Sequence, residues 1–185
     1  PFDQFDQDLA AGWRALQNKG CLTAAAEVLR RYRDEHRPLS QGQRSLLAWH
    51  EGQVLGFMGS YEAAIPLLLA GVPAHDTLDF ADYASGTVAF LQHDKSKLLA
   101  ARARLAAKPK PAAWTDKMTL MAGGKRVSFL TPWPPNLNVL DGLIRCFDRP
   151  YKHAYSCGSL KQVGPGTLPP HAGSGYSAGS GGLNP

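Results

Sequence analysis

The sequence predicts an all-α fold in which three consecutive helix hairpins are followed by one C-terminal capping helix. Apolar residues between positions 2 and 108 recur every three to four residues, which is the spacing of a helix face. Short turn signals interrupt this pattern at intervals that repeat. The most apolar stretch, residues 63–72, is too short to cross a bilayer, so we expect no membrane span.

Composition and cysteine content indicate one globular domain with a tail. The 185 residues are 44% hydrophobic and 19% charged, close to ordinary globular usage and unlike a disordered chain. The three cysteines, Cys21, Cys146 and Cys157, stand at unrelated spacings and leave an odd number. This pattern argues against a disulfide framework and a CxxC-type zinc site, and it favours a reducing, cytoplasmic compartment.

Charge is divided unequally between the two halves of the chain. Residues 1–94 hold seven Lys/Arg and twelve Asp/Glu, a net charge of about −5. Residues 95–185 hold thirteen and three, a net charge of about +10. The division predicts either an acidic partner for the second half or contact between the halves.

The first predicted hairpin joins two amphipathic helices around a turn at residues 18–20. Its first helix carries an apolar stripe from Leu9 through Trp13 to Leu16. The stripe of its second helix comprises Ala25, Val28, Leu29 and Tyr32. The hairpin ends in the charged, turn-rich run of residues 34–39.

The second predicted hairpin begins with a capping box, in which Ser40 and Gln43 each satisfy a backbone N–H that the first helical turn leaves open. The helix runs to Gly59, after which Ser60 can cap the partner helix. Pro66 removes one hydrogen bond within that partner helix, so we expect either a kink or a short regular segment.

The third predicted hairpin begins at a cap supplied by Asp76 or Thr77. Residues 92–94 form its turn. Its last helix is rich in good helix formers and ends before Lys108 and Pro109, because a proline restricts the residue that precedes it.

Beyond residue 110 the helical period is lost. Residues 118–130 fit a small β-hairpin or an irregular loop, and we favour the loop. A last amphipathic helix, expected to shield the end of the stack, carries Leu137, Leu140, Ile144 and Phe147. We therefore divide the chain into a helical repeat domain (1–110), a connector with a capping helix (111–156) and a Gly/Pro/Ser-rich flexible tail (157–185).

The segment AWHEGQVLGFMGSYEAA, residues 48–64, resembles the tetratricopeptide repeat (TPR), a helix-turn-helix unit of about 34 residues. Small and large residues occur there as they do in that family, at Gly52, Leu55, Gly59, Tyr61 and Ala64. The resemblance extends over about residues 5–108. It departs from the family at Trp13, where a small residue is usual, and at Glu51, where leucine is usual.

The resemblance implies a short right-handed superhelix whose first helices line a concave groove for a peptide or partner helix. Carried over by spacing, the groove-facing positions are Arg14, Gln17, Asn18, Trp49 and Gln53. Trp49 would be an aromatic anchor or, alternatively, part of the core, while Arg14 and Asn18 alternatively lie on a solvated face. The predicted function is a non-enzymatic, cytoplasmic adaptor or scaffold for a protein or peptide partner, without a cofactor. Exposed ends of the stack also allow a homodimer.

The sequence offers only weak patterns for chemistry. His50 and Glu51 start a zinc-protease pattern, but its second histidine is missing. Cys157 lies near His153, but at the start of the predicted tail, where a nucleophile and a base could not be preorganised. We therefore expect neither a catalytic nor a metal site.

A basic run gives the alternative function. Between Lys95 and Arg126 nine Lys/Arg face one acid, Asp116. Along the last helix of the third hairpin, the predicted basic patch comprises Lys97, Arg102, Arg104 and Lys108. It indicates a module that binds nucleic acid or an acidic protein through residues 95–126. The simpler interpretation is a solvated helix face whose long side chains cover apolar neighbours.

Overall fold

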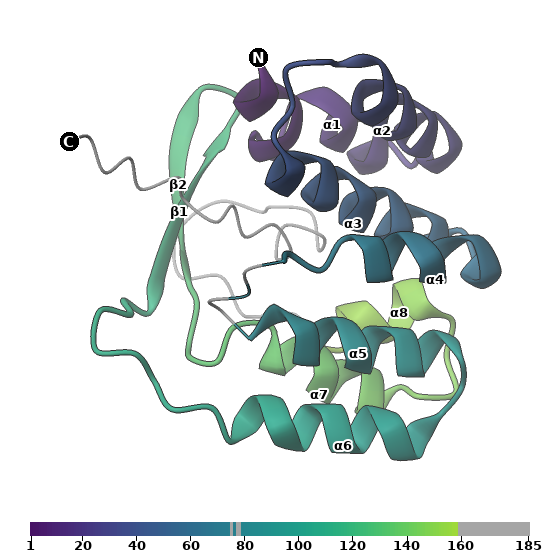
Figure 1. Cartoon of the computed structure of the whole chain (residues 1–185), viewed down its shortest axis with the longest axis vertical. Coiled ribbons are helices and arrows are strands. Elements are labelled where there is room, and N and C mark those ends of the chain that lie inside the picture. The colour runs from purple at the N-terminus through teal and green to yellow at the C-terminus, as the bar shows by residue number, and fades with distance from the viewer. Residues whose placement is uncertain (75, 77–78, 159–185) are drawn as a thin grey trace.

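The computed structural model describes residues 1–74, 76 and 79–158, and this part of the chain is mostly helical with one two-stranded sheet (Figure 1). The elements, in chain order, are η1 (Asp3–Gln7), α1 (Gly12–Asn18), α2 (Leu22–Glu35), α3 (Gln41–Phe57), α4 (Tyr61–Ala70), α5 (Phe80–Leu91), α6 (Lys95–Ala106), β1 (Lys117–Ala122), β2 (Lys125–Leu130), α7 (Leu137–Arg145) and α8 (Tyr151–Ser156). The predicted all-α class thus agrees with the mostly helical structure, except that it did not include the small two-stranded sheet. Within the described ranges, no helix combines the length and apolar character that a membrane crossing requires.

The helices from α1 to α6 form three hairpins in which each helix packs against the next along the chain. The capping box at Ser40 and Gln43 is present as predicted. The Asp76 carboxylate accepts hydrogen bonds from the backbone at the start of α5, also as predicted. Ser60, in contrast, makes no side-chain cap on α4. Pro66 lies inside α4, which nevertheless continues to Ala70.

The expected first helix is interrupted. Residues 8–11 separate η1 from α1, and Leu9 leaves the helical stripe to donate its backbone N–H to the Met121 carbonyl at 2.8 Å. Gly12 starts α1 with a φ of 52°, and a Cβ there would lie 2.0 Å from the Phe5 carbonyl oxygen. Only glycine accepts both conditions, so the chain reverses sharply between η1 and α1.

Residues 117–130 form a β-hairpin, so the preference for a loop is wrong. β1 pairs antiparallel with β2, with Thr119 opposite Ser128. Gly123 and Gly124 both have positive φ, as a two-residue hairpin turn of the mirror-image type requires. The hairpin runs along one side of the molecule, from the level of α5 to the N-terminal segment (Figure 1).

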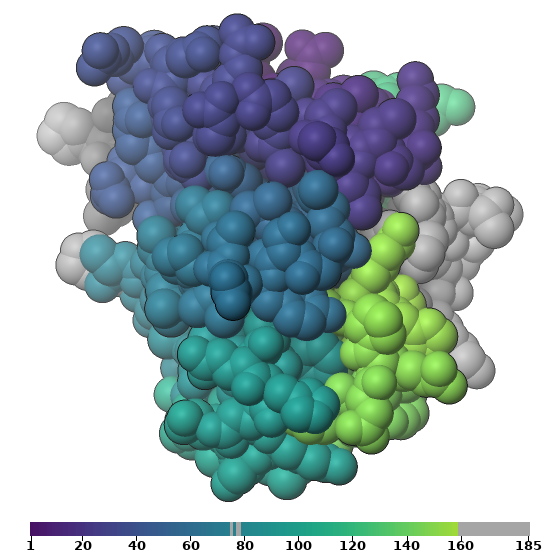
Figure 2. All heavy atoms as spheres, turned by 90° about the vertical axis from the view of Figure 1, so that its right-hand side faces the viewer, coloured from purple at the N-terminus to yellow at the C-terminus, as the bar shows by residue number. Residues whose placement is uncertain are grey.

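The C-terminal capping helix is present as α7, but a second helix, α8, was not predicted. α7 packs on α5 and α6, and α8 packs on α3. Figure 2 shows the two helices beside the α3–α6 stack. The α7–α8 pair therefore lies along the first helices of the second and third hairpins and does more than shield the end of the stack.

Cys146 and Cys157 form a disulfide, although the number and spacing of the cysteines argued against a disulfide framework. Among the described residues, Cys21 is the free cysteine. The bond joins the C-terminal ends of α7 and α8, which the fold brings together although the spacing in sequence shows no motif. Residue 157 is therefore bonded to α7, and the remainder of the predicted flexible tail, residues 159–185, lies outside the described residues.

We predict that Gly52→Ala destabilises the chain by about 1–3 kcal/mol, because its Cβ would lie 3.0 Å from the backbone of α4 and force the two helices apart. Gly42→Ala, in the same helix, is the matched control, since its Cβ would meet nothing closer than 4.0 Å. That control should gain stability, by up to about 1 kcal/mol, from helix propensity. Urea unfolding of both variants measures the difference, and equal effects would contradict the close α3–α4 packing.

Candidate functional site

The predicted groove residues do not line an open groove. Trp49 is 1% exposed and Gln53 2%, and Arg14 and Gln17 are also buried. Of the five, Asn18 alone is exposed, and its side-chain amide donates to the Leu9 carbonyl at 2.9 Å. The chain's own α7–α8 pair lies along α3 and α5, which were expected to line the groove.

Trp49 belongs to the core, which agrees with the alternative interpretation of this residue. Its ring packs edge-on against Phe80 and at a tilt against Tyr83, with centroids 4.6 and 5.3 Å apart. Gly71 brings its backbone so close that a Cβ there would lie 2.6 Å from the Trp49 Cβ. These contacts leave the indole no room to act as an exposed anchor in this conformation.

Gln53 lies in a polar layer between α3, α5 and α8. Its amide approaches the Tyr83 hydroxyl at 3.5 Å. Burial raises the pKa of the Tyr83 and Tyr151 phenols well above the ordinary value, so both stay protonated at neutral pH. The layer therefore consists of neutral groups and serves to join the hairpins to α8.

A second polar cluster is buried where η1, α1 and α3 meet. Asp6 and His50 are both 0% exposed, and the Asp6 Oδ1 lies 2.7 Å from the His50 Nδ1 and 2.9 Å from the Trp13 Nε1. Arg14 donates from Nε to the Asp6 carbonyl at 3.1 Å, and its guanidinium lies 4.2 Å from the centre of the Trp13 ring. The four residues form what we call the Asp6 cluster: Asp6, Trp13, Arg14 and His50.

The contacts of His50 determine its tautomer. Arg14 Nη2 lies 3.4 Å from His50 Nε2, and a guanidinium can only donate. His50 Nε2 must then be the acceptor, which places the ring proton on Nδ1, facing Asp6. The cluster thus places the His50 imidazole between one carboxylate and one guanidinium, with a ring nitrogen close to each.

Burial alone raises the pKa of the Asp6 carboxyl, but the interactions with His50, Arg14 and Trp13 outweigh it and lower this pKa to about 2. The carboxylate is consequently ionised at every physiological pH. In an interior of low dielectric constant, a paired charge of this kind is costly to disrupt, because removal of one partner leaves the other unsatisfied.

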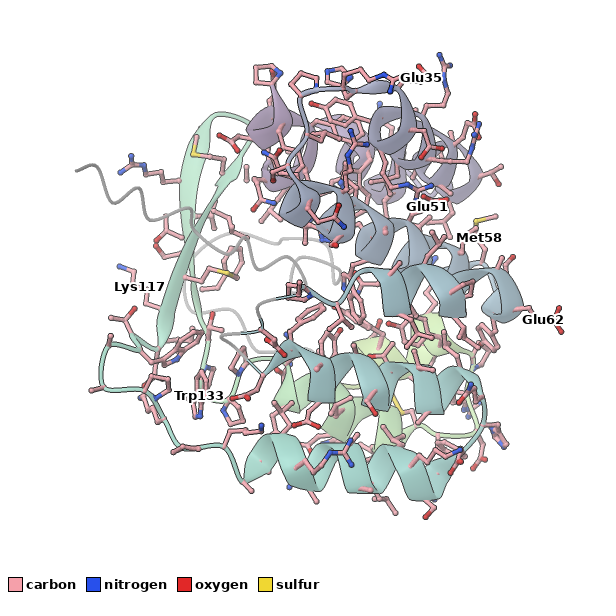
Figure 3. All side chains as sticks on the ribbon, in the orientation of Figure 1. Glu35, Glu51, Met58, Glu62, Lys117 and Trp133 are labelled. Carbon is pink, nitrogen blue, oxygen red and sulfur yellow. A yellow bond between two sulfur atoms is a disulfide. The ribbon has the colours of Figure 1, made fainter. Side chains whose placement is uncertain are left out.

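The Asp6 cluster is sealed from solvent and so has no access for a substrate. Glu51, the neighbour of His50, points toward α2 and pairs with Arg33 (Figure 3). His50 and Glu51 therefore serve separate interactions and do not converge on a zinc ion. The sulfur of Cys157 is engaged in the disulfide, so it does not act as a thiol nucleophile beside His153 in this state.

Three of the four residues in the predicted basic patch pair with acids on α5, at its N-cap or on α7. Arg104 bonds to Asp82 at 2.7 Å and Lys108 to Asp79 at 2.8 Å, both across the α5–α6 hairpin. Arg102 bonds to Asp141 of α7 at 2.8 Å, whereas Lys97 bonds to Asp94, the N-cap residue of its own helix, at 2.9 Å. The charge division between the halves is thus partly explained by contact between them.

A hollow of about 500 Å³ lies between η1 and the outer edge of β1. Its described lining comprises Asp3, Gln7, Ala113, Trp114, Thr115, Lys117, Met118, Thr119, Leu120, Met121 and Thr131. This volume is within the range of ligand-binding clefts. Trp114 fixes one wall, because its indole donates to the Thr131 carbonyl at 3.1 Å and its ring packs edge-on against Trp133.

The outer edge of β1 presents backbone groups to this hollow. The Met121 carbonyl accepts a hydrogen bond from the Leu9 N–H, and Asp8 forms a parallel bridge with Met121. The backbone N–H and C=O of Met121 therefore point outward, away from β2. The N–H and C=O of one residue point to the same edge of a strand, and alternate residues point to opposite edges. Thr119 and Lys117 therefore also direct their N–H and C=O groups outward, beyond the end of the Asp8 bridge.

No family model, no curated protein and no solved structure matches the chain. The outer edge of β1 contains none of the predicted groove residues, and its backbone groups at Lys117 and Thr119 are directed away from β2. Alternating apolar residues around Gly123-Gly124 were the signal that could have indicated it.

We predict that acid destabilises the chain through Asp6. The folded-state pKa, about 2, is below the ordinary 3.8, so this stabilisation is complete above about pH 4 and is lost as the pH falls toward 2. The shift corresponds to a free energy on the order of 2 kcal/mol. Urea unfolding between these pH values should show a steeper loss in the wild type than in Asp6→Asn. Asp3→Asn, an exposed change in the same turn, should keep the wild-type slope, and an unchanged slope in Asp6→Asn would refute this role.

Proposed function

We propose that the chain is a non-enzymatic protein-binding module that takes up an extended peptide along the outer edge of β1. The observation that carries this proposal is the outward-facing backbone of Lys117 and Thr119 beside the hollow of about 500 Å³. Strand addition to an open edge is a recurrent mode of peptide recognition, because main-chain hydrogen bonds supply affinity and neighbouring pockets supply selectivity.

The chain's own N-terminal segment already pairs with part of this strand edge. Asp8 already pairs with Met121 as a short parallel strand. A straight continuation toward the N-terminus would pass Thr119 and Lys117, but residues 3–7 coil into η1 and leave that path. An extended peptide can lie along this path beside Thr119 and Lys117, and so extend the strand pairing that Asp8 makes with Met121.

The walls of the hollow define the chemistry of the peptide. Trp114, Met118 and Leu120 offer apolar surface on one side, while Asp3 and Lys117 place opposite charges on the lining. We therefore propose a segment that presents an apolar side chain toward Trp114 and carries charges complementary to these two residues. Figure 3 shows Lys117 directed away from the helices, where it can reach a bound chain.

The helices provide the rigid frame of the proposed module. We propose that α1–α6 follow the right-handed progression of TPR-like hairpins, supported by the packing of each helix on the next and by the close approach of α4 at Gly52. The groove function of that family is not what we propose, since α7 and α8 lie along α3 and α5. The ion pairs of Arg104 and Lys108 likewise favour an intramolecular role over a nucleic-acid surface.

The compartment stays a prediction. The expectation of a cytoplasmic protein rested on a cysteine pattern that argued against a disulfide framework, and Cys146 and Cys157 nevertheless form a disulfide. Disulfides persist mainly in oxidising compartments. The proposed recognition depends on backbone groups and is compatible with either environment.

Thr119→Pro should weaken peptide binding, because it removes an outward N–H from the edge of β1 without removing a backbone hydrogen bond between the two strands. Peptides selected from a random extended library on the wild-type protein are the probe, and their dissociation constants are measured by calorimetry. We expect a loss of at least about tenfold, equivalent to about 1.4 kcal/mol.

Ser128→Pro is the matched control. Ser128 lies directly opposite Thr119, and each variant loses the same 2.9 Å hydroxyl–hydroxyl hydrogen bond between the two side chains. Ser128 directs its N–H to the other edge of the hairpin, so its replacement should leave peptide affinity unchanged. Equal losses in both variants, or no selected peptide at all, would rule out recognition at this edge.

A further inference from the structure

Three metal-ligating side chains converge at the C-terminal ends of α7 and α8. One ligand atom from each of Cys146, His153 and Cys157 lies within 4.8 Å of the other two. His153 and Cys157 are four residues apart and so share a face of α8 and its end. His153 is exposed and the cysteines are half-buried, so the group can be reached from solvent.

Backbone contacts hold these residues together independently of the disulfide. The Asn138 side chain donates to the Gly158 carbonyl at 2.6 Å, and Arg145 donates to the Cys157 carbonyl at 2.7 Å. Gly142 of α7 approaches so closely that a Cβ there would lie 2.2 Å from the Gly158 nitrogen. Opening of the disulfide therefore leaves residues 157 and 158 seated on α7.

The core side of α8 adds a second anchor. Tyr151, Ala154 and Tyr155 are buried, and the Tyr151 ring stacks on Phe57 of α3 with centroids 5.3 Å apart. These contacts orient the helix so that His153 and Cys157 stay on the side of Cys146. The three ligands are thus preorganised by packing that does not involve the sulfur–sulfur bond.

We propose that, when the disulfide is reduced, Cys146, Cys157 and His153 bind one Zn²⁺ ion, with water as the fourth ligand. Two thiolates and an imidazole form a donor set that suits zinc, with Zn–S near 2.3 Å and Zn–N near 2.0–2.1 Å. Tetrahedral geometry then places the sulfurs about 3.8 Å apart, which rotation of the two cysteine side chains can provide.

The two states of the site exclude each other. A dithiol reductant breaks the bond between Cys146 and Cys157, its own two sulfurs become a disulfide, and its two hydrogens pass to the cysteines. Zinc then displaces the two thiol protons, which go to solvent, and two Zn–S bonds form. Exchange with a small-molecule disulfide, which takes up the two electrons and leaves as two thiolates, re-forms the Cys146–Cys157 bond, removes two ligands and releases the ion. The site therefore couples metal occupancy to the redox state of the chain, separately from the strand edge.

Co²⁺ titration of the reduced chain tests this proposal, because thiolate-bound tetrahedral Co²⁺ has charge-transfer and d–d absorption bands. The protein is reduced with a dithiol, desalted without oxygen and checked by near-ultraviolet circular dichroism. We expect the bands to saturate at one Co²⁺ per chain and to disappear when Zn²⁺ is added. The oxidised protein, which has the same sequence, should show none.

Single substitutions identify the ligands. His153→Ala should weaken Co²⁺ binding at least tenfold, whereas His36→Ala and Cys21→Ser, exposed residues of the same types, should leave it unchanged. Absence of the bands in the reduced wild type would overturn the proposal, as would loss of the native spectrum on reduction, equal binding by the oxidised chain or full affinity in His153→Ala. The comparison of oxidised and reduced wild type needs no variant that could fail to fold.

Discussion

The seating of α8 on α3 is the contact on which the architecture depends. Tyr151 lies over Gly56, where a Cβ would come within 2.8 Å of the ring, and Phe57 stacks against the same tyrosine. A pairing of an aromatic ring with a glycine gives close packing that other residues cannot reproduce. Because this contact draws the last helices of the described chain across the middle hairpin, it removes the inner helix faces from the surface available to partners.

The Asp6 cluster determines the other face of the molecule. An ionised Asp6 bonded to His50 holds residues 3–7 in the helical turn η1, and Gly12 then permits the chain to reverse into α1. If this segment were extended, it would cover β1. The same buried interaction that stabilises the N-terminal hairpin therefore keeps residues 3–7 off the neighbouring edge of β1, so stability and the proposed recognition depend on one set of side chains.

Local signals predicted the hairpins, the capping box and α7, because helix caps and apolar spacing act within a few residues. They could not predict α8, since a six-residue helix contains too few turns to show a period. Nor could they predict the buried state of Asp6 or the pairing of Cys146 with Cys157, because both depend on segments that meet only in the folded chain. The prediction of the groove residues was wrong for the same reason. Spacing along the sequence identifies which residues share a helix face, but it does not show which other element packs against that face.

The bond between the Asp8 carboxylate and the Gly123 N–H links positions 115 residues apart. Long loops are entropically slow to close, and a ribosome releases the N-terminal segment well before its partner strand exists. During synthesis the Asp8 carboxylate therefore has no bond to Gly123 while the central hairpins form from local contacts. Docking of the β-hairpin onto the N-terminal segment is consequently a late event in folding. Until it happens, the chain exposes both the outer edge of β1 and the segment around Asp8 that pairs with it.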